Sequence, residues 1–298
     1  MMTEGSPAFS IIIPTRNRPL QLSNCLRAVA CLERPAEGFE VIVVDDGSTC
    51  DLGPVIDEAR ILLPAKRVRR EHGGPAAARN SGASVARGRF LAFTDDDCRP
   101  VPGWLRAFER RLQTHPTCLV GGSTVNALDS DPFACASQLI VDMVLDHYNR
   151  EHPRFFPSNN LALSADAFHA IGGFSAEFRT AEDRDLCDRW HLRGWPQLFA
   201  PEAVVEHAHG MDFAAFWAQH LGYGRGAHRY LRAHKQRTGD SSLDRSFYLR
   251  LLREIPKRLA QDKRPIHTAT LLAAWQAANT SGFLLEAAKQ MLGRVRAR

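Results

Sequence analysis

Three consecutive aspartates, Asp95, Asp96 and Asp97, are the residues of this sequence with the clearest potential for chemistry. Like charges this close together oppose one another's ionisation, and a divalent cation relieves that repulsion. Mg²⁺ and Mn²⁺ favour carboxylate oxygens, keep few protein ligands, and complete their shell with water and substrate phosphates. The triplet therefore predicts a metal bound to a diphosphate, with a solvated turn as the alternative interpretation.

Acidic residues also occur at two other places where a binding or catalytic role is plausible from local pattern. Asp46 follows a strand pattern, and a carboxylate there can accept a hydrogen bond from a base or a ribose hydroxyl, although Asp-Gly is also a turn signal. Glu182 and Asp183 follow Thr180 in an arrangement typical of helix capping. The dipole of such a helix also keeps a carboxylate ionised, which a general base requires.

The elements that must position these groups alternate along the first 117 residues. Strand patterns at 9–13, 41–44 and 89–94 are separated by helix patterns, which implies parallel pairing in a doubly wound sheet. Ligands of such sheets bind beyond the carboxyl ends of the strands. Three polar clusters follow strand ends, so we expect the topology to bring them to one crevice: Thr15-Arg16-Asn17, Asp45-Asp46 and Asp95-Asp96-Asp97.

The pattern is less regular after residue 117. A strand is predicted over 119–125, followed by a mixed region up to Asn160 with room for a mobile, substrate-covering loop. Thr180 is the expected N-cap of a helix that runs to Arg193. A strand-like stretch then precedes His207, whose imidazole is an acceptable manganese ligand, although a lone histidine is more often structural.

Composition and charge limit the class of protein. A chain of 298 residues with 44% apolar and 24% charged residues is typical of a globular protein. Seven scattered cysteines without a C-x-x-C pair argue against a disulfide framework and a zinc knuckle. The first seven residues contain no export signal, so we expect a cytoplasmic location.

The charge is unevenly distributed along the chain. Residues 212–298 contain 16 Lys/Arg and 6 Asp/Glu, whereas residues 1–211 contain 22 and 27. A basic tail is attracted to anionic surfaces, either phospholipid or nucleic acid, unless it is simply a solvated face. Peripheral contact with the cytoplasmic face of a membrane is one interpretation of this tail, and we expect no nucleic acid. The apolar residues of 268–292 are too interrupted to predict a spanning helix; packing on the catalytic domain is the alternative.

Five motifs, in this order, resemble those of family 2 glycosyltransferases with the GT-A fold. They are Ile13-Pro-Thr-Arg-Asn17, Val44-Asp-Asp-Gly-Ser48, Gly74-Pro-Ala-Ala-Ala-Arg-Asn-Ser-Gly82, Phe93-Thr-Asp-Asp-Asp97 and Gly173-Phe together with Ala181-Glu-Asp-Arg-Asp-Leu186. The resemblance covers about residues 8–211 and implies a Rossmann-like α/β fold with a mostly parallel central sheet and a helical C-terminal extension. The expected domains are 1–211, with a nucleotide-binding half at about 8–117 and an acceptor half at about 118–211, and a basic helical region at 212–298.

The same resemblance implies roles for individual residues. The catalytic base is Asp183, with Glu182 as the second candidate. The metal, Mn²⁺ or Mg²⁺, is held by Asp97, with Asp95 and His207 as further ligands. The expected nucleotide-sugar-binding residues are Pro14, Thr15, Arg16, Asp46, Gly74, Arg79, Asp95, Asp96 and Asn160.

The reaction implied is an inverting transfer of a sugar from a nucleotide diphosphate, with UDP expected, to an acceptor hydroxyl. A glycan or glycolipid of the cell surface is the expected acceptor. Two alternatives remain open: a catalytically silent nucleotide-sugar-binding protein and a nucleotidyltransferase. The second usually has a Gly-rich, basic phosphate loop after its first strand, which Pro14-Thr-Arg-Asn17 lacks.

Overall fold

The computed structural model describes residues 6–240 and 244–296 and divides the chain into two compact units. Unit 1 consists of Met1–Ala127 and Pro153–Ala208, and unit 2 consists of Leu128–His152 and His209–Arg298. Residues 128–152, which lie in the acceptor half expected from the sequence, are therefore grouped with the C-terminal helices.

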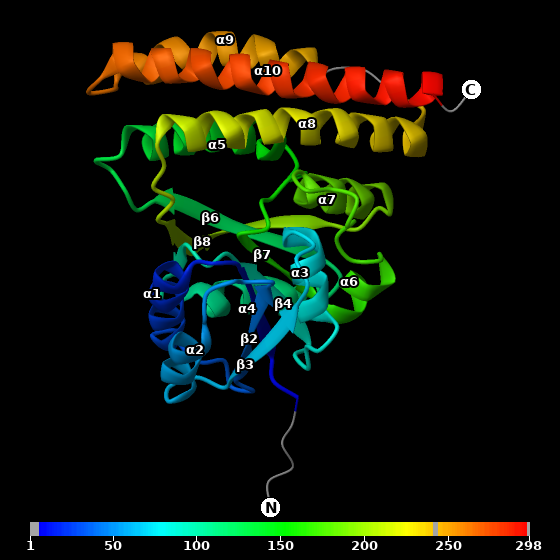
Figure 1. Ribbon diagram of the computed structural model, residues 1–298. Helices are drawn as coiled ribbons and strands as arrows, with labels where there is room; N and C mark the ends of the chain where they lie inside the picture. The colour runs from blue at the N-terminus through cyan, green and yellow to red at the C-terminus, as the bar shows by residue number, and fades with distance from the viewer. Residues whose placement is uncertain (1–5, 241–243, 297–298) are drawn as a thin grey trace, which may run out of the picture. The chain divides into compact units, whose positions relative to one another are not determined.

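Unit 1 is built on an eight-stranded sheet with the order β3-β2-β1-β4-β7-β6-β8-β5 (Figure 1). The strands are β1 (Phe9–Thr15), β2 (Phe39–Asp46), β3 (Ala65–Arg70), β4 (Phe90–Thr94), β5 (Cys98–Pro100), β6 (Leu119–Asn126), β7 (Asn160–Ser164) and β8 (Gln197–His207). Four pairings are parallel: β1 with β2, β1 with β4, β2 with β3 and β6 with β8. The pairings β4–β7, β6–β7 and β5–β8 are antiparallel. The α/β fold with a mostly parallel sheet is confirmed.

The first strands are apolar at successive positions because both faces of the sheet are covered. Ile11 and Ile13 of β1 belong to one buried cluster, whereas Ile12 between them belongs to another. The first cluster includes side chains of α1 (Pro19–Ala30), α2 (Gly53–Arg60) and α4 (Trp104–Thr114), and the second includes side chains of α3 (Pro75–Ala83), α6 (Ala165–Ala170) and α7 (Glu182–Leu192).

The described residues of unit 2 form four helices: α5 (Pro132–Asn149), α8 (Phe213–Thr238), α9 (Arg245–Ala260) and α10 (Pro265–Arg296). Its apolar cluster includes Ile140 of α5, Phe216 of α8, Leu251 of α9 and Trp275 of α10. None of the helices within the described residues is long and apolar enough to cross a membrane.

Two glycines set the crossing of α8 and α10. A Cβ atom on Gly224 would lie 1.9 Å from the carbonyl oxygen of Asn279, and one on Gly282 would lie 2.0 Å from that of Leu221. The two backbones therefore approach more closely than any larger residue allows at these positions.

Two local predictions from the sequence need correction, and one short strand was missed. The region before Asn160 contains the 18-residue helix α5, where a mixed region with room for a mobile loop was expected. The Asp131 carboxylate caps α5 by accepting hydrogen bonds from the N–H groups of Phe133 and Ala134, at 2.8 and 3.1 Å. The N-cap of α7 is Ala181 rather than Thr180. The short strand β5, directly after the aspartate triplet, was not predicted.

Candidate active site

The carboxyl ends of β2, β1 and β4 lie next to one another, as expected for the three polar clusters. Thr15 pairs in register with Asp45, and the triplet 95–97 follows β4, the other neighbour of β1. The Thr15 hydroxyl donates a hydrogen bond to the Asp96 carboxylate at 2.7 Å. The Asn17 side-chain oxygen accepts from the N–H of Thr49 at 2.8 Å. The prediction that these clusters converge is confirmed.

The three aspartates of the triplet have different surroundings. Asp96 is buried against Thr15 and also accepts a hydrogen bond from Arg18 at 3.1 Å. Burial raises the pKa of Asp96 to about 6, although Thr15 and Arg18 favour its ionised form. Asp95 pairs with Arg79 at 2.6 Å. Asp97 pairs with the same Arg18 at 2.9 Å and lies on the side of β8.

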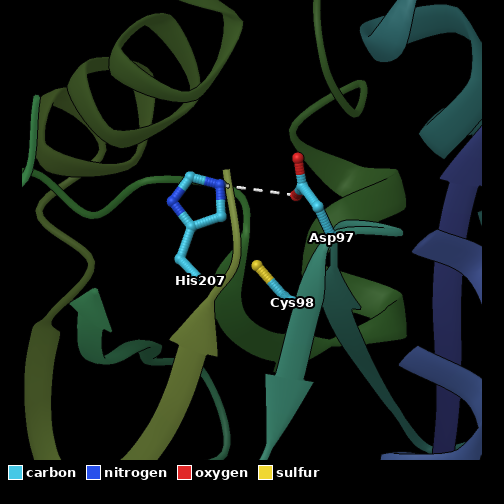
Figure 2. Close-up of side chains that lie close together, drawn as sticks. All are labelled: Asp97, Cys98 and His207. Carbon is cyan, nitrogen blue, oxygen red and sulfur yellow. Dashed lines mark ion pairs between the residues drawn. The ribbon is translucent and has the colours of Figure 1, made fainter. Parts of the chain in front are cut away.

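Among the described residues, one group could hold a metal ion: Asp97, Cys98 and His207 (Figure 2). One potential ligand atom of each lies within 4.8 Å of the others, and the Asp97 carboxylate is 3.4 Å from His207 Nε2. The pairing of β5 with β8 brings Cys98 opposite His207, 109 positions along the chain. The carboxylate and the imidazole are acceptable ligands for Mn²⁺. Burial raises the pKa of the Cys98 thiol well above its usual value, so this group stays protonated and is a poor ligand for either Mn²⁺ or Mg²⁺.

Cys98 was not identified from the sequence. A single cysteine beside an acidic motif has no metal-binding spacing of its own, and only the strand pairing brings it to His207. Asp95, expected as a further metal ligand, lies outside this group, and its carboxylate contacts Arg79 instead.

Asp46 is held by the loop after β3. Its carboxylate accepts hydrogen bonds from the N–H groups of Gly73 and Gly74, at 3.0 and 2.8 Å, and contacts His72 at 2.8 Å and Arg70. Burial raises the pKa of Asp46, but these donors outweigh it, so the pKa lies below its usual value. The loop backbone therefore keeps Asp46 ionised, and Gly74, with φ of 91°, begins α3 in a conformation that glycine adopts without strain.

The other nucleotide residues expected from the sequence differ in exposure. Pro14 is partly buried within β1, whereas Arg16 is exposed just beyond its end. Asn160 is fully buried. Its side chain accepts a hydrogen bond from the Trp104 indole at 2.8 Å and donates to the carbonyls of Ser123 and Ala203, at 2.8 and 2.9 Å. These contacts join α4, β6, β7 and β8.

Arg79 connects the aspartate triplet with the start of α7. Its guanidinium is 3% exposed and pairs with Asp95 at 2.6 Å and with Glu182 at 2.9 Å. It also lies 5.7 Å from the ring centre of Phe174. Burial lowers the pKa of Arg79, but the two carboxylates outweigh it and raise the pKa above its ordinary value. A buried cation with two carboxylate partners fixes both acids in place.

Glu182 and Asp183 form the first turn of α7, directly after Ala181, which has a left-handed φ of 70°. Asp183 accepts a hydrogen bond from the N–H of Arg184 at 2.7 Å and a longer one from that of Ser158 at 3.4 Å. Burial raises the pKa of Asp183, and burial together with the Asp183 charge raises that of Glu182. The two titrate as a coupled pair that binds a proton more readily than isolated carboxylates do.

The chain matches known proteins over most of its length. The family described as glycosyl transferase family 2 matches residues 10–185. The pre-mycofactocin glycosyltransferase of Mycobacterium tuberculosis is 30% identical over 243 residues, which cover 77% of this chain and 48% of that protein. The chain thus spans about half the length of this curated relative.

Two solved structures share the fold at low identity. The mannosyltransferase PcManGT from Pyrobaculum calidifontis, in complex with GDP-Man and Mn²⁺, matches with a TM-score of 0.64 and 19% identity, covering 98% of this chain and 81% of that one. TarS 1–349 of S. aureus, in complex with UDP-GlcNAc, matches with a TM-score of 0.55 and 16% identity, covering 95% and 91%.

Proposed function

The chain belongs to glycosyl transferase family 2, and from this premise we propose that it transfers a sugar from a nucleotide diphosphate to an acceptor hydroxyl with inversion. The observation that carries the proposal is the convergence of Asp97 and His207 at the strand ends where Asp46 and Thr15 also lie. Two potential metal ligands beside the carboxyl ends of parallel strands suit a donor that carries a diphosphate.

The donor would lie across the ends of β2, β1 and β4. Pro14, Thr15 and Arg16 would lie beside the nucleotide. The base would replace Arg70 or His72 as a hydrogen-bond partner of the ionised Asp46, whose oxygens already accept from four donors. We propose uracil as the base. The two structural neighbours were solved with GDP-Man and UDP-GlcNAc, which supports a nucleotide-diphosphate sugar as the donor class.

Asp97 and His207 would hold a divalent cation, with Cys98 beside them and Asp95 close to the ribose. When bound, such a cation neutralises the charge that develops on the departing diphosphate. The protein's own contribution is to orient the two ligands: Arg18 pairs with Asp97 from one side, and the β5–β8 pairing presents His207 from the other.

Asp183 acts in this proposal as the base that removes the proton from the acceptor hydroxyl as its oxygen attacks the anomeric carbon. Its raised pKa makes it a stronger base than an ordinary aspartate, as proton abstraction near neutral pH requires. Glu182 is paired with Arg79 and serves to position the start of α7. Attack opposite the leaving diphosphate inverts the anomeric configuration and needs no covalent intermediate.

Residues 1–211 would form the catalytic domain and 212–298 a basic helical region, in a protein located in the cytoplasm. The acceptor class that we propose is a cell-surface glycan or glycolipid precursor, presented at the cytoplasmic face of a membrane. The excess of cations in residues 212–298 supports this assignment, because anionic lipid attracts them.

Two substitutions test the enzyme against the silent binding protein and the nucleotidyltransferase. In Asp183→Asn, we expect sugar transfer to fall at least ~100-fold, because a neutral amide cannot accept the proton. The Mn²⁺-dependent rise in melting temperature with UDP should remain, because donor binding does not use this carboxylate. In Asp97→Ala, the Mn²⁺-dependent rise itself should disappear.

Asp57→Asn is the matched control, because this exposed carboxylate of α2 lies outside the site. It should behave as the wild type in both measurements. Undiminished transfer in both Asp97→Ala and Asp183→Asn, with the fold retained, would overturn the assignment of the site.

A further inference from the structure

One stripe of exposed positions along α10 carries no charge, whereas His267 and Lys289 are exposed elsewhere on the helix. Eight exposed positions follow one another at helical spacing on the side opposite the buried Leu271, Trp275 and Ala278. They are Ile266, Thr270, Ala273, Ala277, Thr280, Leu284, Ala288 and Met291. At 1.5 Å per residue this stripe is about 38 Å long.

An uncharged exposed stripe is unusual for a helix at a protein surface, because such helices normally present polar and charged residues to water. Helix α4 of unit 1 follows that rule, since its exposed positions include Arg106 and Arg110. By contrast, Ile266, Leu284 and Met291 of α10 are 85%, 60% and 62% exposed. This stripe of α10 is thus suited to a less polar environment than water.

Helix α9 adds apolar and basic side chains to the same surface of unit 2. It packs against α5 and α10 through Leu251, and α9 and α10 lie side by side in Figure 1. Its exposed side carries Leu249 and Leu252, the second 73% exposed, with Arg253 and Lys257 among them.

The segment that forms α9 and α10 is rich in basic residues. The segment 245–296 contains ten Lys/Arg and three Asp/Glu. Of the three acids, Glu286 is buried and paired with Arg229 of α8, and Glu254 is paired with Lys257. Two of the cations have acidic partners, Lys257 in Glu254 and Arg258 in Asp146 of α5, but basic residues outnumber acids in this segment. Exposed apolar side chains among an excess of cations are the combination found in helices that lie on anionic membranes.

We propose that the exposed side of α9 and α10, called here the α9–α10 face, binds the surface of an anionic phospholipid bilayer without crossing it. The apolar stripe enters the boundary between headgroups and acyl chains, and the cations contact lipid phosphates. A second copy of the chain fits less well, because a two-fold contact through this face would bring identical cations together. The proposal is independent of the sugar-transfer chemistry.

Vesicle co-sedimentation of the full chain at low salt tests the proposal. The wild type should bind vesicles that contain phosphatidylglycerol at least tenfold more strongly than vesicles of phosphatidylcholine alone, because the cations require anionic headgroups. Leu252→Glu/Leu284→Glu should reduce that binding at least tenfold. Arg253→Glu/Lys257→Glu should reduce it similarly and weaken its dependence on salt.

The matched control is Ile61→Glu/Leu62→Glu, which places the same charges at two exposed apolar positions of unit 1, 81% and 64% exposed. This variant should bind as the wild type does. Circular dichroism and the thermal shift with UDP and Mn²⁺ should be unchanged in all variants, so that a failure of donor binding is separated from a failure of lipid binding.

Three results would overturn the proposal. The first is equal binding of the wild type to both kinds of vesicle. The second is undiminished vesicle binding by Leu252→Glu/Leu284→Glu. The apolar side chains would then play no part, and the cations alone would bind any polyanion, nucleic acid included. The third is a wild-type dimer in light scattering that Leu284→Glu converts to a monomer, since the face would then be occupied by a second copy.

Discussion

Units 1 and 2 bury charge to very different extents. In unit 1, Asp45, Asp46, Asp96, Asp97 and Glu182 are all buried, and each has a cationic partner. In unit 2 the one buried carboxylate of the described residues is Glu286. Burying charge contributes little to net stability, so a concentration of buried, paired acids indicates a site that requires them.

Unit 2 is packed through apolar side chains and closely approaching helices. Its cluster is apolar and aromatic, and α8 and α10 approach closely at Gly224 and Gly282. Such a unit can remain folded while one exposed stripe of α10 lacks charge. The difference agrees with the two proposals, sugar transfer at the acids of unit 1 and lipid binding by the α9–α10 face of unit 2.

Arg79→Met should have the largest effect on stability, and the destabilisation should be confined to unit 1. It leaves Asp95 and Glu182 without their shared cation, and removal of one partner from a buried charge cluster costs about 3–5 kcal/mol. Urea denaturation measures the cost, and hydrogen exchange of individual peptides locates it.

Arg87→Met is the control for this change. Arg87 pairs with Glu40 at 3.4 Å but is largely exposed, so its loss should cost less than about 1 kcal/mol. Equal costs for the two variants would contradict the view that unit 1 depends on its buried ion pairs.

Gly282→Ala tests the corresponding dependence of unit 2 on close helix packing. Helix propensity alone would stabilise α10 by about 1 kcal/mol. We expect a net destabilisation of about 1–3 kcal/mol instead, because the new methyl group would overlap the backbone of α8. Hydrogen exchange should increase in α8 and α10 only.

Gly103→Ala provides the same chemical change at a position where nothing lies within 4 Å of the added atom. It should leave the free energy of unfolding nearly unchanged. Stabilisation by Gly282→Ala would mean that the two helices separate easily, and that close packing does not hold unit 2 together.

The comparison of the two units also predicts how the stability of two Glu→Gln variants depends on pH. These effects should be smaller than those of the Arg79 and Gly282 substitutions. Hydrogen bonds from Arg229 lower the pKa of Glu286 against the opposing effect of burial. Its carboxylate therefore stabilises unit 2 above the ordinary pKa of 4.5, and this contribution disappears as the pH falls through the lowered value. The difference in free energy of unfolding between the wild type and Glu286→Gln should therefore become smaller as the pH falls.

Glu182→Gln should show the opposite trend. Burial and Asp183 raise the pKa of Glu182, so the wild type loses stability as the pH rises from 4.5 through the raised value. The variant has no carboxylate to ionise at this position, so it should become more stable relative to the wild type as the pH rises over this range. Urea unfolding at a series of pH values measures both, and parallel trends would show that the two carboxylates do not differ as proposed.

Much of the polar cluster at the ends of β1, β2 and β4 was predictable from short stretches of sequence. Apolar runs identified β1, β2 and β4, and the rule that parallel strands end at the same edge brought Thr15, Asp46 and Asp96 together. The helix α5 was missed, although Asp131 before Pro132 is a capping signal, because its buried and exposed positions give a weak helical pattern.

The sequence by itself determined which residues follow which strands, because strand periodicity and turn residues act over a few positions. Only the tertiary structure decided that Cys98 joins Asp97 and His207, that Arg79 connects Asp95 with Glu182, and that one exposed stripe of α10 carries no charge. Each of these depends on which distant segments pack together. That choice is made by the burial of the whole chain, which no local pattern contains.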